Sequence, residues 1–559
     1  MRRNNILRYA EGPLCLAEKI TQGRTTCSIA MRISYSALVD KSYSTKMLCG
    51  QRLIRSLCTA RSQFHSINVK KQHIRRAATT TTGKKEGTIA DAFASLSGQA
   101  FAPLEPRFAD IKRELIRGNE KAVAASWRRL LTKLQVETKL ISDLGSRVIP
   151  EIDYTEIDQR NEAFNQEYRK RGVAVIRNVV PRDEAIALKE ELRQYIKANP
   201  QTKAFPEGNP QVYELYWSPT QVKARSHPNL LHAQKFLLSY WHSKDPNALV
   251  TTEPILYADR LRMRLPGDAK FALGPHVDGG GPERWEPAGY GKAHTYDSIF
   301  SGRWEEYDPW ESSTRLEVDS DLYQGGGACS AFRMAQGWLS LSRTGPLEGT
   351  LLVNPLLQLA TAYLLLRPFF TPKSSPANVA ETSIDSLAYD RFLHPDNWVM
   401  ESPMSSWVQG ASPGRGQELS SELHPHLLLD KTMIHVPTVS PGDYVAWNCD
   451  TIHAVDKVHA GKSDSSVLYI PACPLTVRNA EYLVRQRETF LQGTPSPDFP
   501  GGVGESQHKG RMLVEDAAAV STRDGMRAFG LERWDSEREE LTPGGRETMR
   551  KANEILGFS

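Results

Sequence analysis

Residues 273–282, Leu-Gly-Pro-His-Val-Asp-Gly-Gly-Gly-Pro, constrain the fold of this chain more than any other segment. They contain a histidine and a carboxylate one residue apart, His276 and Asp278. On an extended strand, residues i and i+2 point to the same face, so these two side chains can be directed at one point. The glycines and the proline that follow allow the chain to turn away sharply. By itself, the spacing also fits a surface turn that has no chemical role.

A second segment far downstream, residues 440–455, supplies a third potential ligand. It contains a Pro-Gly turn, a short apolar strand, a second turn and then His453. Two histidines and one carboxylate form the facial triad that holds ferrous iron and leaves coordination positions open. We therefore expect His276, Asp278 and His453 to be the metal ligands and the catalytic centre. The other histidines that could bind a metal lack this context: His294, His424, His426, His435 and His459.

The order of these motifs resembles the Fe(II)/2-oxoglutarate-dependent dioxygenases, in particular the phytanoyl-CoA-hydroxylase-like group. Residues 261–267 form an alternating strand that ends in a Pro-Gly turn before the H-x-D motif. Residues 171–184 are similar to the opening strand and first helix of that group, and residues 336–355 to its central strand pair. The resemblance covers residues 165–480. The whole chain is similar to a branch of the superfamily that is known only as a domain of unknown function.

This resemblance implies an α+β fold that is mainly β with flanking helices, built around a double-stranded β-helix as in jelly rolls and cupins. It also implies Fe(II) as the metal, 2-oxoglutarate as the cosubstrate and O2 as the oxidant. The expected reaction is hydroxylation of a small-molecule substrate with release of succinate and CO2. Asp278 favours hydroxylation, because the related halogenases have a halide in place of this carboxylate.

The basic residue for the far carboxylate of 2-oxoglutarate departs from the family pattern. In many relatives an arginine follows the distal histidine on the closing strand, but the matching segment here contains Lys462 and no arginine. A guanidinium is the best partner for a carboxylate. The candidates are Arg478, Lys462, Arg333 and one of the three arginines Arg260, Arg262 and Arg264. Of these, Arg264 and Arg478 rank first.

Arg264 belongs to a run in which Arg260, Arg262 and Arg264 alternate with apolar residues. A period of two places all three arginines on one face of a strand. A solvated outer face is the simpler interpretation of this run. The alternative directs at least one arginine into the barrel, near the metal.

Two other classes of function stay open. A double-stranded β-helix without catalytic activity would be a binding or regulatory module. A cupin-like metalloenzyme would use Fe, Mn or Zn without 2-oxoglutarate. The intact H-x-D motif and distal histidine argue against an inactive scaffold, whereas the missing family arginine favours these two alternatives. Metal content and succinate production separate the three classes.

Positive charge is concentrated near the N-terminus. Residues 1–85 contain 17 lysines and arginines and three acidic residues, whereas the remainder contains 53 basic and 62 acidic residues. The acid-poor, Arg-, Ser- and Thr-rich leader is typical of a mitochondrial transit peptide, and a basic tail without a targeting role is the alternative. The acidic remainder gives no electrostatic support for binding nucleic acid.

The seven cysteines have no C-x-x-C spacing and favour a reducing compartment.

The sequence pattern also predicts how the chain is divided. The predicted parts are a leader (1–85), a helical segment (86–164), a dioxygenase-like domain (165–495) with insertions at 283–330 and 371–425, and a C-terminal linker with helices (496–559). The first insertion is rich in aromatic residues, and we interpret it as a lid or substrate wall. Polar residues interrupt the apolar run at 351–370, so a buried helix is expected there and no membrane span.

Overall fold

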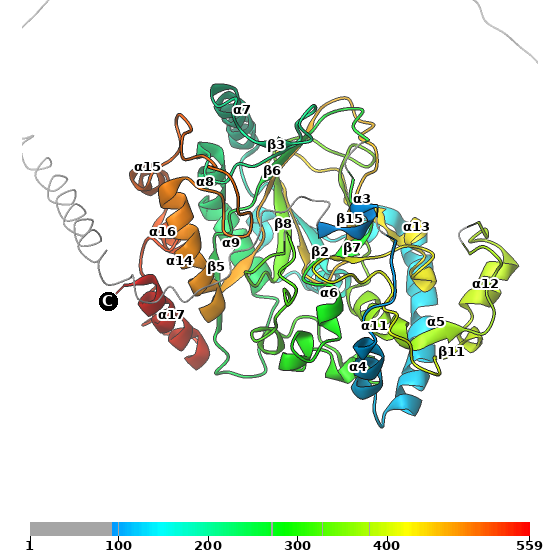
Figure 1. The fold of residues 1–559 in the computed structure, drawn as a ribbon. Helices are drawn as coiled ribbons and strands as arrows, with labels where there is room; N and C mark the ends of the chain where they lie inside the picture. The colour runs from blue at the N-terminus through cyan, green and yellow to red at the C-terminus, as the bar shows by residue number, and fades with distance from the viewer. Residues whose placement is uncertain (1–91, 99, 270–271, 327, 380, 559) are drawn as a thin grey trace, which may run out of the picture. The chain divides into compact units, whose positions relative to one another are not determined.

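The computed structural model describes residues 92–98, 100–269, 272–326, 328–379 and 381–558. The basic leader lies outside the described residues, and its targeting role stays a prediction. Helices flank the β-sheets (Figure 1), so the α+β class is confirmed. No helix within the described ranges is long and apolar enough to cross a membrane.

The larger sheet has eight strands in the order β1-β2-β14-β8-β16-β6-β4-β3. Their bounds are Glu151–Asp153 (β1), Val173–Arg177 (β2), Tyr444–Asn448 (β14), Ala335–Ser340 (β8), Ser465–Tyr469 (β16), Leu261–Arg264 (β6), Val212–Tyr213 (β4) and Ala204–Phe205 (β3). The sheet is mixed, since β1 runs parallel to β2 whereas β2 runs antiparallel to β14. In β2, Val173 and Val175 pack into one apolar core while Ala174 and Ile176 pack into another. Alternate side chains point to opposite faces of a strand, so this sheet separates two cores.

The smaller sheet has five strands in the order β12-β7-β15-β9-β13, all paired antiparallel. Their bounds are Gln417–Glu418 (β12), His276–Val277 (β7), His453–Val455 (β15), Leu351–Val353 (β9) and Ile434–His435 (β13). Along the chain, β6, β8, β14 and β16 belong to the larger sheet, and β7, β9, β13 and β15 belong to the smaller one. The two predicted ligand segments therefore meet as neighbouring strands of one sheet.

The N-terminal helices α4 (Arg107–Leu115) and α5 (Glu120–Leu144) form where the apolar periodicity predicts helices. On α5, the Trp127 ring is buried and stacks on Phe370 with the ring centroids 4.5 Å apart. The apolar run after β9 forms the buried helix α11 (Leu357–Leu366), as predicted. Burial of such faces drives the packing of these helices against the core.

The other helices and strands complete the layers around the two sheets. The remaining helices are α3 (Ala94–Ser97), α6 (Glu162–Arg171), α7 (Arg182–Ala198), α8 (Pro219–Arg225), α9 (Pro228–Leu238), α10 (Asp297–Phe300), α12 (Leu387–Leu393), α13 (Leu429–Thr432), α14 (Val477–Gln492), α15 (Val514–Val520), α16 (Arg523–Ala528) and α17 (Pro543–Leu556). The strands β5 (Val250–Ile255) and β17 (Cys473–Thr476) pair with each other, as do β10 (Phe370–Pro372) and β11 (Trp398–Met400). In Figure 1, α14, α16 and α17 gather on the side of the sheets where β5 lies.

The aromatic insertion at 283–330 has the predicted role of a cavity wall only in part. Glu283, Ser320 and Asp321 line the main cavity described below, and Tyr290 lines the smaller one. Trp285, Trp304 and Trp310 are buried in the apolar cores and border neither cavity described below. The lid interpretation is therefore wrong for these tryptophans. Their large apolar surfaces are more stable inside the protein than at a solvent-facing wall.

Candidate metal centre

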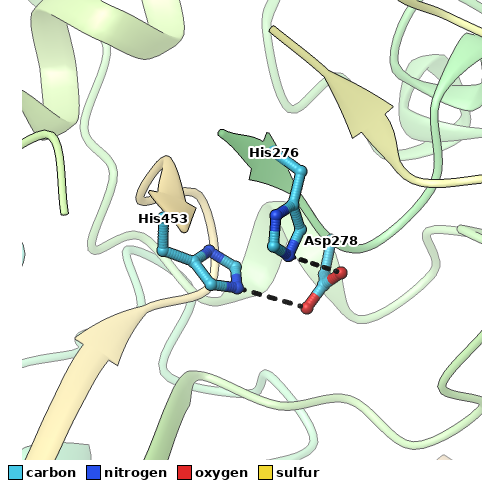
Figure 2. A group of neighbouring side chains, drawn as sticks. All are labelled: His276, Asp278 and His453. Atoms are coloured by element: carbon cyan, nitrogen blue, oxygen red, sulfur yellow. Dashed lines mark ion pairs between the residues drawn. The ribbon is translucent and has the colours of Figure 1, made fainter. Parts of the chain in front are cut away.

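His276, Asp278 and His453 come together at the junction of β7 and β15 (Figure 2). His276 lies directly opposite His453 in the antiparallel pairing of these strands. The Nε2 atom of His276 lies 3.8 Å from Oδ1 of Asp278, and Nε2 of His453 lies 3.6 Å from Oδ2. The potential ligand atoms of the three side chains all lie within 4.8 Å of one another. This spacing allows all three to bind one metal ion.

Hydrogen bonds orient the three side chains for metal binding. Nδ1 of His276 lies 2.7 Å from the carbonyl oxygen of Gly274, and Nδ1 of His453 lies 3.0 Å from that of Thr451. A proton on Nδ1 donates to the carbonyl and leaves the Nε2 lone pair directed at the shared point. Nε2 of Gln336 donates to Oδ2 of Asp278 over 2.9 Å. The sequence analysis missed Gln336, the second residue of strand β8, as a partner of Asp278.

The electrostatics of the site favour the protonation states that metal ligands need. Burial opposes ionisation of Asp278, but His276, His453 and Arg333 outweigh it and lower the pKa of this carboxyl. Burial is also the main influence on His453, and together with His276 it lowers the pKa of that imidazole. An ionised carboxylate and a neutral imidazole are the forms that coordinate a metal.

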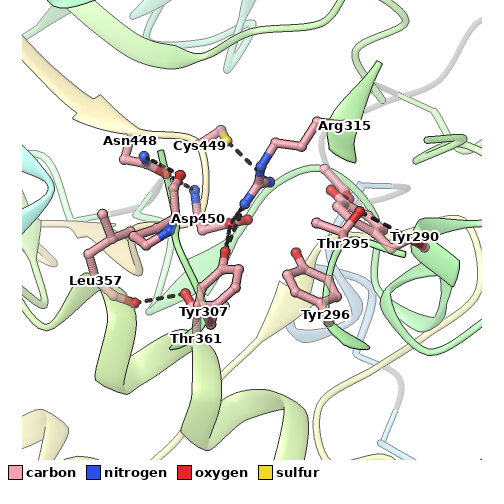
Figure 3. A network of polar contacts seen from close by, with 12 residues as sticks. Tyr290, Thr295, Tyr296, Tyr307, Arg315, Leu357, Thr361, Asn448, Cys449 and Asp450 are labelled. Carbon is pink, nitrogen blue, oxygen red and sulfur yellow. Dashed lines mark hydrogen bonds and ion pairs between the residues drawn. The ribbon is translucent and has the colours of Figure 1, made fainter. Parts of the chain in front are cut away.

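A buried network that includes Asp450 connects the two ligand segments. Figure 3 shows the part of it that contains Arg315, Tyr307 and Asp450. Nη1 of Arg284 pairs with Oδ1 of Asp450 at 2.9 Å, and Nη2 of Arg284 donates to the backbone carbonyl of Asp278 at 2.8 Å. Nη2 of Arg315 pairs with the second oxygen of Asp450 at 2.6 Å, and the Tyr307 hydroxyl donates to the same oxygen at 3.1 Å. Burial opposes the ionised form of Asp450, but the two arginines hold the pKa of this carboxyl well below its usual range. Nothing in the local sequence pattern predicts this network.

The candidate metal centre borders a cavity of about 520 Å³. The larger sheet contributes Arg262, Trp338 and Val467 to the lining, and the smaller sheet contributes both histidines of the centre. A second cavity of about 60 Å³ is also lined by Asp278. Three arginines and two cysteines are among the residues that line this smaller cavity: Arg315, Arg333, Arg478, Cys329 and Cys449.

The candidates for the cosubstrate carboxylate lie in different places. Arg264 borders the main cavity, but its Nε is paired with Asp268 at 2.7 Å and its Nη atoms donate to backbone carbonyls. Arg478 borders the smaller cavity and donates to a backbone carbonyl. Arg333 borders both cavities. Lys462 is exposed and borders neither of them.

The interpretation of the arginine run as a solvated outer face is wrong. Arg260, Arg262 and Arg264 all line the main cavity, and Arg262 and Arg264 are 5% and 0% exposed. The other face of β6 packs Leu261 and Met263 into an apolar core. Because β6 lies between β16 and β4 with both faces covered, its polar face points into the protein.

The five further histidines that the sequence analysis considered as metal ligands lie outside the ligand group. His435 pairs with Asp456 at 2.6 Å, and the exposed His294 pairs with Asp297 at 2.9 Å. His424 and His426 are buried, and burial lowers the pKa of both to about 3. Their surroundings are aromatic, which explains why they remain neutral core residues.

Comparisons with known proteins agree with the resemblance seen in the sequence. The profile of the Gig2-like family matches residues 102–531. The chain is 29% identical over 411 residues to the uncharacterized protein YbiU of Escherichia coli strain K12, covering 71% of this chain and 88% of YbiU. It is also similar to the crystal structure of GlcNAc Inducible Gene 2 (GIG2, DUF1479) from Candida albicans, with 32% identity and a TM-score of 0.71 over 82% of this chain and 96% of that one.

A further similar structure comes from Salmonella typhimurium LT2, where the protein is described as a candidate oxidoreductase. That match has 29% identity and a TM-score of 0.63, and it covers 77% of this chain and 98% of the Salmonella chain. The designation DUF1479 confirms the predicted membership of a domain-of-unknown-function branch. Since the family profile matches most of the sequence, the chain belongs to the Gig2-like family.

Proposed function

We propose that this protein is an Fe(II)- and 2-oxoglutarate-dependent oxygenase that hydroxylates a small organic substrate. The observation that carries this proposal is the convergence of His276, Asp278 and His453 at the wall of a large cavity. The description of the Salmonella relative as a candidate oxidoreductase is consistent with it.

The arrangement of strands supports a double-stranded β-helix as the core. Along the chain, the strands from β6 to β9 alternate between the larger and the smaller sheet, and those from β13 to β16 do so again. Two sheets whose strands from β6 to β16 pair antiparallel and are connected in this way have the pattern of a jelly roll. The main cavity is lined from both sheets, as expected for the interior of such a barrel.

The three side chains fit a ferrous ion. His276 and His453 would supply neutral nitrogen ligands and Asp278 an anionic oxygen, the donor set of a facial triad with open positions. When bound there, iron with 2-oxoglutarate and O2 supplies the oxidising power for hydroxylation, with release of succinate and CO2. Gln336 and Arg284 would keep Asp278 in its orientation. The buried cavity would keep bulk water away from the reacting groups.

Arg262 is the residue that we assign to the far carboxylate of 2-oxoglutarate. It lies opposite Val467 on β16, and Val467 lies opposite Ser340 on β8. Ser340 is four residues beyond Gln336 on β8, which corresponds to roughly 13 Å along the strand, away from the metal centre. An extended arginine and a five-carbon diacid together bridge a gap of this size. Arg264 lies two pairs further along the same strand, opposite Ser465.

An anaerobic titration tests this function. Fe(II) and then 2-oxoglutarate are added to the purified protein, and the weak visible charge-transfer band of the chelated complex is recorded. We expect the band in the wild type and in His435→Ala, which removes a histidine of the same sheet outside the centre. We expect no band in Asp278→Ala. In His276→Ala, iron binding is lost while the circular dichroism spectrum is retained.

The other outcomes of this titration select the alternative functions. Tight iron binding without a band, in the presence of 2-oxoglutarate, rejects this cosubstrate and favours a cupin-like metalloenzyme. If neither Fe, Mn nor Zn binds, the protein is a binding module without metal chemistry. Either result overturns the proposed function.

A further inference from the structure

Arg333 is a cationic side chain at the candidate metal centre, and the acidic side chain that its charge acts on is Asp278, one of the three predicted metal ligands. It lies two residues before β8 and borders both the main and the smaller cavity. Its guanidinium carbon lies 5.8 Å from the centre of the Tyr257 ring. Within the described part of the chain, Arg333 makes neither a hydrogen bond nor an ion pair. A guanidinium inside a protein is costly unless an anion neutralises it.

The smaller cavity beside Arg333 is lined by an excess of positive charge. Arg315 and Arg478 also line the smaller cavity, and Asp278 is the acidic residue that lines it. Arg315 shares Asp450 with Arg284, so that cluster itself has one positive charge in excess. Burial disfavours the charged form of Arg333, but its neighbours, among them the carboxylate of Asp278, raise its pKa above the ordinary value, so it stays charged.

Asp278 and Asp498 line the main cavity together with Arg333, and both already have other partners. Asp278 belongs to the metal centre. Asp498 accepts a hydrogen bond from the Tyr257 hydroxyl at 2.9 Å and two from Ser330, at 3.0 Å from its backbone N–H and at 2.6 Å from its hydroxyl. An anion that enters from the cavity would therefore be the counter-ion of Arg333.

Arg333 lies on the opposite side of the metal centre from Arg262. On β8, Gln336 contacts Asp278, Ser340 is level with Arg262 through β16, and Arg333 precedes the strand at its other end. A cosubstrate that extends from the metal centre towards Arg262 therefore points away from Arg333. Arg333 is left for a different molecule.

We infer that Arg333 binds a carboxylate of the substrate, so that the site takes a small organic acid. This inference rests on the function proposed above and specifies its substrate class. A single planar guanidinium matches the two oxygens of a carboxylate through parallel hydrogen bonds. The cavity of about 520 Å³ has space for such a molecule beside the cosubstrate.

The test uses benzoate as the carboxylate probe and benzamide as its neutral counterpart. Binding to the metal-free protein is measured by saturation-transfer NMR. Since a hydrogen bond to a charged group contributes about 1.5–3 kcal/mol, benzoate should bind the wild type at least about tenfold more tightly than benzamide. The preference should disappear in Arg333→Gln. It should persist in Arg262→Gln and in Arg343→Gln, which removes the same charge from an exposed site.

Three results would overturn the inference. The first is equal binding of benzoate and benzamide by the wild type. The second is a preference for benzoate that survives in Arg333→Gln, or one that is lost only in Arg262→Gln. Loss only in Arg262→Gln would place the bound carboxylate at Arg262. The third is phenyl phosphate that binds tenfold more tightly than benzoate, which would replace the carboxylate with a phosphate.

A conservative variant covers the case in which Arg333→Gln does not fold. Arg333→Lys keeps the charge but not the planar fork, so it should show a reduced and measurable preference for benzoate. An unchanged preference in Arg333→Lys, with circular dichroism like that of the wild type, would contradict recognition by the guanidinium. The measurement needs neither iron nor 2-oxoglutarate. Failure of the proposed cofactors is therefore distinguishable from failure of the carboxylate site.

Discussion

Arg284 and Asp450 form a buried ion pair, with 2.9 Å between Nη1 and Oδ1, that joins the two segments carrying the metal ligands. Arg284 follows Asp278 in the chain and donates to its backbone carbonyl, while Asp450 shortly precedes His453. This contact fixes the separation of the two segments in addition to the pairing of β7 with β15. The candidate centre is therefore held in shape by the protein itself, a requirement for an efficient site.

Asp450→Asn should strongly destabilise the fold. The substitution leaves Arg284 and Arg315 buried without their shared counter-charge, and breaking such a group typically costs about 3–5 kcal/mol. Urea denaturation at pH 7 measures the free energy of unfolding. As a control, Asp396→Asn breaks the exposed pair with Arg128 and should leave the urea midpoint unchanged. Equal midpoints for the two variants would show that the buried network is not required for stability.

Gln336→Met should weaken metal binding with little effect on stability. The variant removes the hydrogen bond to Asp278 while keeping a side chain of similar size. Loss of a partner that orients a ligand typically lowers metal affinity by about 10–100-fold. A competition titration with Co(II) measures the affinity. Gln358→Met removes an amide that contacts the backbone of Tyr307 and serves as the control. Unchanged affinity in Gln336→Met would mean that Asp278 needs no such support.

Glu283→Gln should change how stability depends on pH. Burial, with Glu286 and Asp321 adding to it, raises the pKa of Glu283 from 4.5 to about 7. A carboxyl whose pKa is higher in the folded than in the unfolded protein stabilises the fold fully when the pH is below its unfolded-state pKa. For Glu283, this contribution to the free energy of unfolding is lost as the pH rises from 4.5 to 7. At pH 8 the variant should therefore exceed the wild type by about 3 kcal/mol, and at pH 4 the two should be equal.

Urea denaturation of both proteins at pH 4, 6 and 8 measures this difference. The wild type should lose stability relative to the variant across this range, because only the wild type must release a buried proton. A constant difference between the two proteins at all three pH values would contradict a raised pKa at Glu283.

Gly442→Ala should be far more damaging than Gly510→Ala. Both glycines have positive φ, 94° and 75°, so an alanine is strained at either position. At Gly442 the added Cβ would also lie 2.0 Å from the backbone oxygen of Val180, whereas at Gly510 it meets nothing within 4 Å. The strain alone costs about 1–2 kcal/mol, and the clash at Gly442 should raise the loss above about 3 kcal/mol. Thermal unfolding of the two variants compares them, and similar losses would exclude the clash.

Local sequence pattern predicted the parts of the site that depend on one element at a time. The spacing of His276 and Asp278 on a strand and the turn–strand–turn context of His453 identified the ligand group that the structure brings together. Apolar periodicity predicted α4, α5 and the buried helix α11. These features follow from the geometry of a single strand or helix and need no distant contact.

Tertiary structure decided the roles that depend on contacts between distant segments. A period of two placed Arg262 and Arg264 on one face, but the coverage of β6 on both sides turned that face into the cavity. The aromatic composition of the insertion fits a lid and a buried core equally well. Tertiary packing placed its tryptophans in the core. Gln336 and the pair of Arg284 with Asp450 reach the metal centre only through long-range pairing. The sequence alone determined which residues could act as ligands, whereas the register between distant strands and the burial of charge decided how those ligands are held.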